Sequence, residues 1–298
     1  MISFLGSNIQ PALTPKTARV AILPVPYERT TSYRKGAQHG PEALLVASEQ
    51  LELYDEQLGC EVGSRFGIYT HPPVADTRQG NPGSAADVMA AIAQATKDLI
   101  QHGCWVVALG GEHSITGAIA RAYQQAHPHE PFTVVQIDAH GDLRYEYEGS
   151  IYSHACVMHR IRELGLPSLP VGIRSLSQAE AEIIAADRIP VIWAHEIASD
   201  RTWQTRAVDC IQTERVFLTI DLDGINPAAM PGVGTPEPGG LSWYGLLKFL
   251  SELFARHQVI GCDIMELAPL TDSVVSQFAA AKLTYKLIGL QAKHQQWL

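Results

Sequence analysis

The chain has 298 residues, 46% hydrophobic and 18% charged, so it can bury a large core as one α/β domain or as two smaller ones. Its formal charge of −9, without any run of Lys and Arg, argues against nucleic acid as a partner. No apolar stretch approaches the roughly 18 residues of a membrane span, and the N-terminus lacks the pattern of a signal peptide. Five scattered cysteines without a CxxC pair indicate free thiols and a cytoplasmic location.

Apolar and helix-compatible segments alternate along the chain. Continuous apolar runs predict strands at 20–24, 104–109, 132–137, 171–174, 190–193, 215–220 and 259–263. The segments between them predict helices at 40–58, 85–102, 114–126, 178–186, 242–257 and 273–290. A long loop rich in Pro and Gly covers 226–240. This alternation predicts an α/β fold with a mostly parallel sheet covered by helices on both faces.

Side chains that commonly bind metal ions follow three of the predicted strands. They are His113, then Asp138, His140 and Asp142, and finally Asp221 and Asp223. In an extended backbone, alternate residues point to one face, so the members of each group are expected to converge. Ligands of parallel sheets bind beyond the carboxyl ends of the strands, where all three groups lie.

The composition of this set predicts two ions rather than one. Four carboxylates and two imidazoles are too many for a single divalent ion, and the four negative charges balance two such ions. Oxygen-rich ligands without thiolate favour a hard or borderline metal. Manganese is the first expectation, with nickel, cobalt or zinc as alternatives. Two metals sharing one water would lower its pKa and supply a nucleophile.

Five sequence blocks, taken in order, resemble the signature of the ureohydrolase (arginase–agmatinase) family. They are LGGEHS, DAHGD, YSHAC, DLDGINPAAMPGVGTPEPGG and DIMEL. The resemblance implies a three-layer αβα, arginase-like fold with one domain over residues 1–298. It also implies hydrolysis of a guanidino compound to urea and an amine by a hydroxide that bridges two manganese ions. Glu112 stands where many relatives have Asp, and Gly141 where many have a larger residue, which affects the expected shape of the pocket.

The resemblance also assigns roles to individual residues. One metal would be held by His113, Asp138, Asp142 and Asp221, and the other by Asp138, His140, Asp221 and Asp223. His154 would move protons or assist departure of the amine, and Glu266 would pair with the guanidinium. Without the resemblance, His154 reads as a surface-loop histidine, and Glu266 as a helix cap or surface charge.

The loop at 143–152 is expected to contact the far end of the substrate. It is acidic and aromatic, and it is similar to loops of agmatinase-like members of the family. Glu146 or Glu148 would face a distal ammonium, or they are solvated loop acids. Arg144 would recognise a carboxylate or form an ion pair with a neighbouring Glu.

The first functional hypothesis is therefore an agmatinase, which converts agmatine and water to putrescine and urea. The alternatives within the family are an arginase, a guanidinobutyrase or guanidinopropionase, and a guanidine hydrolase. Outside it, a non-catalytic metal-binding or regulatory protein and a mono-zinc amide hydrolase stay open. The expected partners are a small cationic guanidino substrate and further copies of the chain in a trimer or hexamer, with no nucleic acid and no membrane.

Overall fold

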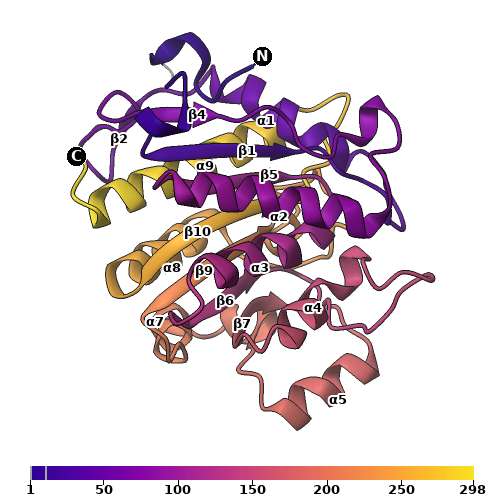
Figure 1. The fold of residues 1–298 in the computed structure, drawn as a ribbon. Coiled ribbons are helices and arrows are strands. Elements are labelled where there is room, and N and C mark those ends of the chain that lie inside the picture. Colours follow the sequence, from indigo (N-terminus) through magenta and orange to yellow (C-terminus); the bar gives the residue numbers. More distant parts are fainter. Residues whose placement is uncertain (1, 11) are drawn as a thin grey trace.

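A computed structural model describes residues 2–10 and 12–298, and these residues form an eight-stranded sheet in the order β4-β1-β5-β10-β9-β6-β7-β8 (Figure 1). Each strand pairs with its neighbours in parallel. The strands are β1 (Val20–Val25), β4 (Ile68–Thr70), β5 (Trp105–Gly110), β6 (Phe132–Ile137), β7 (Ser168–Ile173), β8 (Ile192–Trp193), β9 (Arg215–Asp221) and β10 (Gln258–Met265). A separate antiparallel pair consists of β2 (Tyr54–Asp55) and β3 (Cys60–Glu61).

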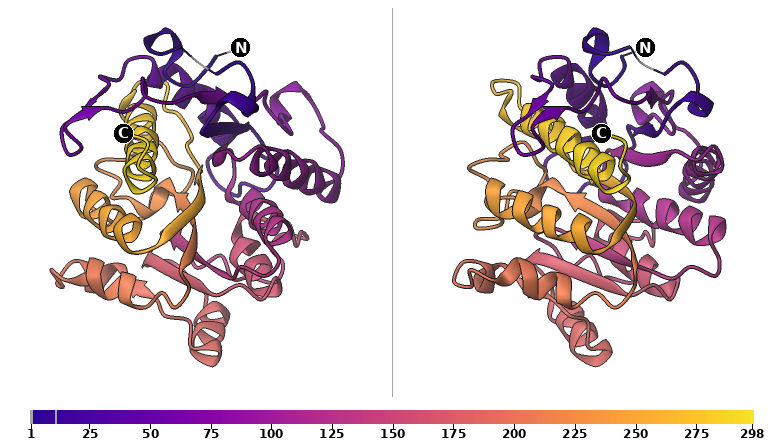
Figure 2. Two further views of the ribbon diagram at one scale, coloured as in Figure 1. Left: turned by 60° about the vertical axis from the view of Figure 1, so that its left-hand side comes forward. Right: turned by 90° about the vertical axis from the view of Figure 1, so that its left-hand side faces the viewer.

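Helices cover both faces of the sheet (Figure 2). One face carries α1 (Gly40–Ser48), α7 (Trp203–Asp209), α8 (Trp243–Arg256) and α9 (Val275–His294). The other carries α2 (Ala85–Gln101), α3 (Thr116–Ala126), α4 (Val157–Glu163) and α5 (Gln178–Asp187). Within β6, Val134 packs into one apolar core and Val135 into the other. The sheet is therefore buried on both sides, which confirms the predicted three-layer αβα architecture.

The helix predicted at 40–58 was wrong in its second half. It ends at Ser48, whose buried hydroxyl donates to Leu45 O and accepts from the N–H of Leu5. The chain then turns toward α9, where Asp55 accepts hydrogen bonds from the N–H groups of Gln57 and Leu58. These side-chain contacts replace the helical pattern that the sequence suggested.

Several short elements were not predicted from the sequence. They include the strands β2, β3 and β4, and the helices α4, α6 (Ala194–Ile197) and α7. Short segments have weak periodicity, and tertiary packing decides their conformation. Among residues 2–10 and 12–298, no helix is both long enough and apolar enough to cross a membrane.

The order of the strands brings together the polar residues that follow them. Strands β5, β10, β9 and β6 are consecutive neighbours in the sheet. Since they are parallel, their carboxyl ends lie at one edge. Three short 3-10 helices begin near this edge: η5 (His113–Ile115), η6 (His154–Cys156) and η7 (Leu222–Gly224). Residues far apart in the chain are thus brought to a single site.

Candidate metal centre and active site

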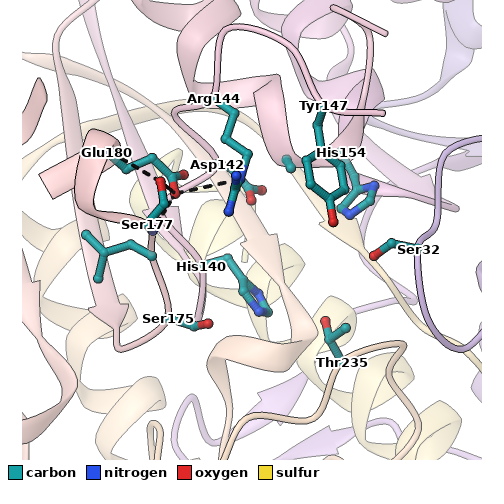
Figure 3. A pocket seen from close by; sticks show the side chains of 13 residues that line it. Ser32, His140, Asp142, Arg144, Tyr147, His154, Ser175, Ser177, Glu180 and Thr235 are labelled. Carbon is teal, nitrogen blue, oxygen red and sulfur yellow. Dashed lines mark hydrogen bonds and ion pairs between the residues drawn. The ribbon is translucent and has the colours of Figure 1, made fainter. Parts of the chain in front are cut away.

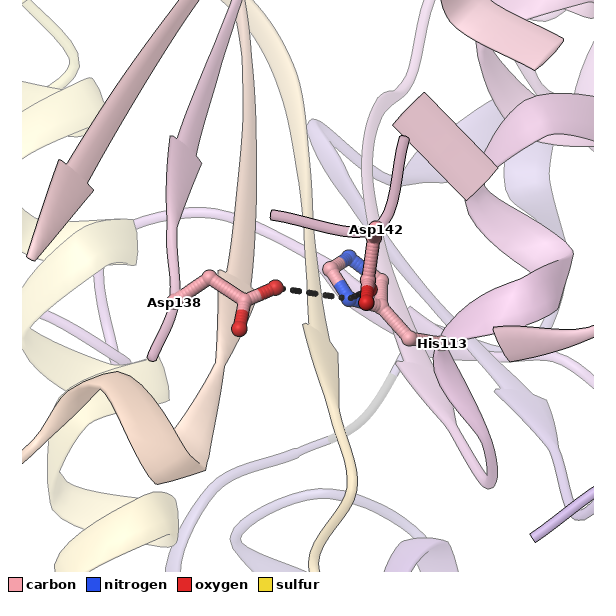
Figure 4. A group of neighbouring side chains, drawn as sticks. All are labelled: His113, Asp138 and Asp142. Carbon is pink, nitrogen blue, oxygen red and sulfur yellow. Dashed lines mark ion pairs between the residues drawn. The ribbon is translucent and has the colours of Figure 1, made fainter. Parts of the chain in front are cut away.

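The first group of side chains surrounds His113, at the start of η5. Its Nδ1 lies 3.1 Å from Asp138 Oδ2, and 3.3 Å from both Asp142 Oδ2 and Asp221 Oδ2. Figure 4 shows His113 with Asp138 and Asp142. All four residues are buried. One nitrogen and three carboxylate oxygens converge from the ends of three different strands.

The second group surrounds His140, in the loop after β6. Its Nδ1 lies 2.9 Å from Asp223 Oδ2 and 3.7 Å from Asp138 Oδ1. The two oxygens of Asp138 therefore face different groups, Oδ2 toward His113 and Oδ1 toward His140. Asp221 lies with the first group, and its Oδ1 accepts a hydrogen bond from the N–H of Asp223 at 2.9 Å. With Asp221 beside His113, the six side chains form two adjoining clusters that share the carboxylate of Asp138.

The residues converge by a different backbone geometry from the extended one predicted. Asp223 lies in the 3-10 helix η7, and Asp142 has a left-handed backbone with φ +52°. Gly224 permits the close approach of η7 to β6, because a Cβ at this position would lie 2.7 Å from the backbone nitrogen of Asp138. Tight turns, rather than strand alternation, bring the carboxylates together.

The first cluster has the chemistry of a metal site. His113 Nδ1 is buried and has no hydrogen-bond partner among the described residues, although three carboxylate oxygens surround it. Its Nε2 lies 2.8 Å from Thr219 Oγ1. Metal-binding histidines usually engage their second ring nitrogen in this way, which orients the ring. The arrangement leaves Nδ1 free to coordinate a cation, so the donor set fits the expected metal.

The carboxylates are held in an environment that requires positive charge. Burial and the neighbouring Asp223 and Asp138 raise the pKa of Asp221 well above its usual range. Burial and Asp138 raise the pKa of Asp142 to about 7. Burial works to lower the pKa of His140, but the neighbouring carboxylates of Asp138 and Asp223 outweigh it and raise the pKa to about 12. Divalent cations bound between these carboxylates would directly relieve the repulsion of their negative charges.

Glu266 lies immediately after β10 and reaches the same site. Its Oε1 accepts a hydrogen bond of 2.7 Å from the N–H of His113. Its backbone has φ +64°, a conformation that costs a non-glycine residue on the order of 1 kcal/mol or more. Burial, together with the charge of Glu112, raises the pKa of Glu266 well above its usual range. Strain and burial at this position are typical of a functional residue.

Two adjoining cavities give access to these groups. The smaller one, of about 30 Å³, is lined by His113, Asp221, Asp223 and Glu266, among others. The larger one, of about 270 Å³, is lined by the residues labelled in Figure 3, among others. Five residues line both cavities: Ser32, His140, Asp142, His154 and Thr235. The larger cavity therefore leads directly to the metal-binding clusters.

His154 begins η6 and lies between the two cavities. Burial lowers the pKa of His154 below its usual range, so the ring is neutral near pH 7. The edge of Tyr147 packs against it, with ring centroids 6.0 Å apart. His154 is therefore placed to exchange a proton with a ligand in either cavity.

The outer wall of the larger cavity contains an acid that the sequence analysis missed. Glu180 is buried and accepts hydrogen bonds from the N–H of Leu143, and from the N–H and hydroxyl of Ser177. The Nε of Arg144 lies 3.8 Å from Glu180, and its guanidinium stacks on Tyr147 at 5.0 Å. The spacing Ser177-x-x-Glu180 is a capping box, a local signal that could have drawn attention to this residue.

The structure places the two loop acids that were predicted to contact the substrate on the exposed surface. Glu146 and Glu148 are exposed, and neither is among the described residues that line the two cavities. From the same loop it is Arg144 and Tyr147 that line the larger cavity. The alternative interpretation of Arg144 as an ion-pair partner agrees with the structure, although its partner comes from α5.

Comparison with known proteins finds a matching family, similar sequences and a similar solved structure. A family model described as the arginase family matches residues 18–289. The N(1)-aminopropylagmatine ureohydrolase of Synechocystis sp. is 54% identical, over 94% of this chain and 91% of the relative. An agmatinase of Pyrococcus horikoshii is 33% identical over 95% of each chain. The crystal structure of agmatine ureohydrolase of Thermoplasma volcanium has a TM-score of 0.82 at 28% identity, over 95% of this chain and 93% of that one.

Proposed function

The chain belongs to the arginase family and is a ureohydrolase, and from this premise we propose that its substrate is N(1)-aminopropylagmatine. Hydrolysis of the guanidino group of this compound releases urea and leaves spermidine as the amine. The observation that carries the proposal is the 54% identity, over 94% of the chain, to a relative named for this reaction. It revises the expectation of agmatine, which lacks the aminopropyl extension.

The smaller cavity, called the inner cavity below, suits the guanidinium end of such a substrate. Oε1 of Glu266 is engaged by the N–H of His113, and its second oxygen remains for the planar N–H groups of the guanidinium. Placement by this carboxylate would hold the guanidinium carbon beside the two clusters. Positioning of this kind contributes strongly to catalysis, because it replaces a bimolecular encounter.

We propose that the clusters hold two manganese ions. His113, Asp138, Asp142 and Asp221 would bind one, and Asp138, His140, Asp221 and Asp223 the other, in keeping with the shared position of Asp138. Bound metal would supply a water of lowered pKa as the nucleophile. His154 would accept a proton and return it to the departing amine, since an amine leaves only when protonated.

The larger cavity, called the outer cavity below, is consistent with a substrate longer than agmatine. At about 270 Å³ it is close to the lower end of the usual range for small-molecule sites, roughly 300–1,000 Å³. Its wall includes the buried carboxylate of Glu180, the ring of Tyr147 and the hydroxyl of Ser175. A chain carrying a secondary and a primary ammonium complements an acid and an aromatic face. In this proposal the substrate competes with Arg144 for Glu180.

Urea release from a panel of guanidino compounds tests the substrate. With manganese-loaded protein, kcat/KM for N(1)-aminopropylagmatine should exceed that for agmatine by at least about 10-fold, because only the longer chain reaches Glu180. Arginine, guanidinobutyrate, guanidinopropionate and guanidine should be poorer still. Glu180→Gln should reduce this preference while leaving the rate on agmatine within about threefold of the unaltered protein.

Agmatine is the second candidate, favoured by the 33% identical relative named agmatinase. Equal or higher kcat/KM with agmatine in the same panel would overturn the longer substrate and keep the ureohydrolase chemistry. A homo-oligomer of three or six chains and a cytoplasmic location remain proposals that the family resemblance and the free thiols support.

A further inference from the structure

Glu112 is a buried carboxylate with no direct place in the proposed chemistry. Its Oε2 accepts hydrogen bonds from the N–H groups of Arg29 and Thr30, at 2.6 and 2.5 Å. Its Oε1 accepts from the hydroxyls of Thr30 and Ser114, at 2.8 and 2.6 Å. Four donors therefore converge on one side chain, which is fully buried. Such complete pairing is typical of a group that holds other residues in place.

Close packing of the backbone brings Glu112 to the segment that contains Arg29 and Thr30. The N–H of Glu112 donates to Tyr27 O at 2.9 Å. A Cβ at the preceding residue, Gly111, would lie 2.0 Å from that same carbonyl oxygen, so only glycine permits the approach. Thr30 is thereby held next to Glu112 although 82 residues separate them in the chain.

Thr30 links Glu112 to His154. The hydroxyl of Thr30 lies 3.3 Å from Nδ1 of His154 and accepts a hydrogen bond from the backbone N–H of His154 at 3.1 Å. A hydroxyl has one proton, and that of Thr30 is directed to Glu112. Toward His154 the oxygen can therefore only accept, and it lies closer to Nδ1 than the Ser153 hydroxyl, which is 3.5 Å away, so this contact favours protonation of Nδ1 in the neutral ring. Nε2 then has the free lone pair, and it has no hydrogen-bond partner among the described residues.

We propose that Thr30 and Glu112 are positioning residues that hold His154 in its Nδ1–H tautomer, so that Nε2 is the nitrogen that exchanges protons with the substrate. This inference rests on the proposed function, in which His154 accepts a proton and returns it to the leaving amine. The wrong tautomer would present an N–H to a group that needs a base. Tautomer control by a hydrogen-bond acceptor is a general property of catalytic histidines.

Kinetics of two Thr30 variants provide the first test. Thr30→Val removes the hydroxyl at nearly constant shape, and kcat should fall roughly 10–100-fold, part of the 10²–10⁴ that acid–base catalysis contributes. KM should stay within about twofold, and the manganese content should not change. Thr30→Ser keeps the hydroxyl and should retain kcat within about threefold. Wild-type kcat in Thr30→Val, or an equal loss in Thr30→Ser, would overturn the inference.

A matched control separates tautomer control from loosening of the segment. Thr77 also anchors this segment, since its hydroxyl accepts from the N–H of Glu28 and lies within hydrogen-bond distance of Pro26 O and Gln38 Oε1, without contacting His154. Thr77→Val should leave kcat within about threefold of the unaltered protein. A loss equal to that of Thr30→Val would assign both effects to the segment and overturn the inference.

Nitrogen NMR of the histidine rings reads the tautomer without any turnover. Zinc-loaded protein is suitable because manganese is paramagnetic and broadens nearby signals, and the His154 signals are assigned by their loss in His154→Gln. The unaltered protein should show a protonated Nδ1, and Thr30→Val a shift toward protonated Nε2. A protonated Nε2 in the unaltered protein would overturn the inference. If no guanidino compound yields urea, the proposed function fails while this measurement still decides the tautomer.

Discussion

At the scale of single residues, the site is defined by how each polar atom is partnered. Both oxygens of Asp138 accept hydrogen bonds: Oδ2 from Gln136 Nε2 at 2.8 Å, and Oδ1 from the N–H of His140 at 2.6 Å. These bonds aim one oxygen at each cluster. Burial works to raise the pKa of Asp138, but the nearby imidazoles of His113 and His140 outweigh it and hold the pKa below its usual range. A shared carboxylate oriented in this way is the feature on which two metals depend.

Replacement of Asp138 tests the two-metal proposal. Asp138→Asn should lower turnover by at least about 100-fold, more than is typical when an outer hydrogen-bond partner is lost, and bound manganese should fall together with it. Turnover and metal content per chain are the measurements. Asp98→Asn, which alters an exposed acid on α2, is the matched control and should change neither.

The metal count also separates the classes of protein. About two ions per unaltered chain would support a binuclear ureohydrolase. One ion would favour a mono-zinc amide hydrolase, and none would favour a non-catalytic role. A folded Asp138→Asn protein with full activity would refute the binuclear mechanism.

At the scale of elements, arginines from distant segments hold the Pro- and Gly-rich loop that closes the site. Arg34 donates to Val233 O and Ala268 O, at 3.1 and 3.0 Å. Arg174 donates to Asp223 O at 2.7 Å and to Glu237 O at 3.0 Å. The loop contributes Gly234 and Thr235 to the inner cavity. Its shape therefore depends on long-range contacts as well as on its own prolines and glycines.

A buried ion pair fastens the β2–β3 hairpin to α9. Nζ of Lys286 lies 3.1 Å from Asp55 Oδ2 and 2.9 Å from Glu56 Oε1, and both Lys286 and Asp55 are buried. Lys286→Met should lower the free energy of unfolding by about 3 kcal/mol, because it leaves the buried Asp55 carboxylate unpaired. Urea-induced unfolding measures this change.

The comparison for this prediction is Lys293→Met, an exposed lysine on the same helix, which should change the unfolding free energy by less than about 0.5 kcal/mol. Adding Asp55→Asn to Lys286→Met should recover part of the loss, since both charges are then removed. Equal stability of the two lysine variants would show that the ion pair contributes little.

At the scale of the whole molecule, stability and metal binding are expected to be coupled. The proposed ligands come from β5, β6, β9 and the turns that follow them, so bound ions would join segments across the centre of the sheet. An ion that binds only the folded chain stabilises it by about 2.7 kcal/mol per site at a 100-fold excess over Kd. Metal would thus hold together the edge where four buried carboxylates repel one another.

Removal of metal should therefore lower thermal stability. Chelated protein is expected to unfold on the order of 5 °C or more below manganese-saturated protein, as the stabilisation per site and the size of the chain suggest. Scanning calorimetry measures both states, and Asp138→Asn, treated in the same way, should show a smaller difference. Identical unfolding temperatures with and without saturating manganese would contradict the coupling.

Much of the architecture could be predicted because it depends on local sequence. The apolar runs at 132–137 and 215–220 match β6 and all but the last residue of β9, since a strand buried on both faces must be apolar throughout. The helix predicted to 58 ended ten residues early because Ser48 and Asp55 bind partners on other segments. The local hydrophobic pattern indicates which residues are buried, but it does not indicate hydrogen-bond or ion-pair partners on distant segments.

The sequence by itself determined the α/β class, the strands of the sheet centre and the six candidate metal ligands, because residue type and spacing express burial and coordination chemistry directly. Only the tertiary structure decided how those ligands pair and which residues surround them. Only the strand order places Glu180 and Thr30 at the site, and Glu146 and Glu148 do not line either cavity. The physical reason is that hydrogen bonds between segments 82 or 124 residues apart depend on the packing of the sheet, which no local pattern contains.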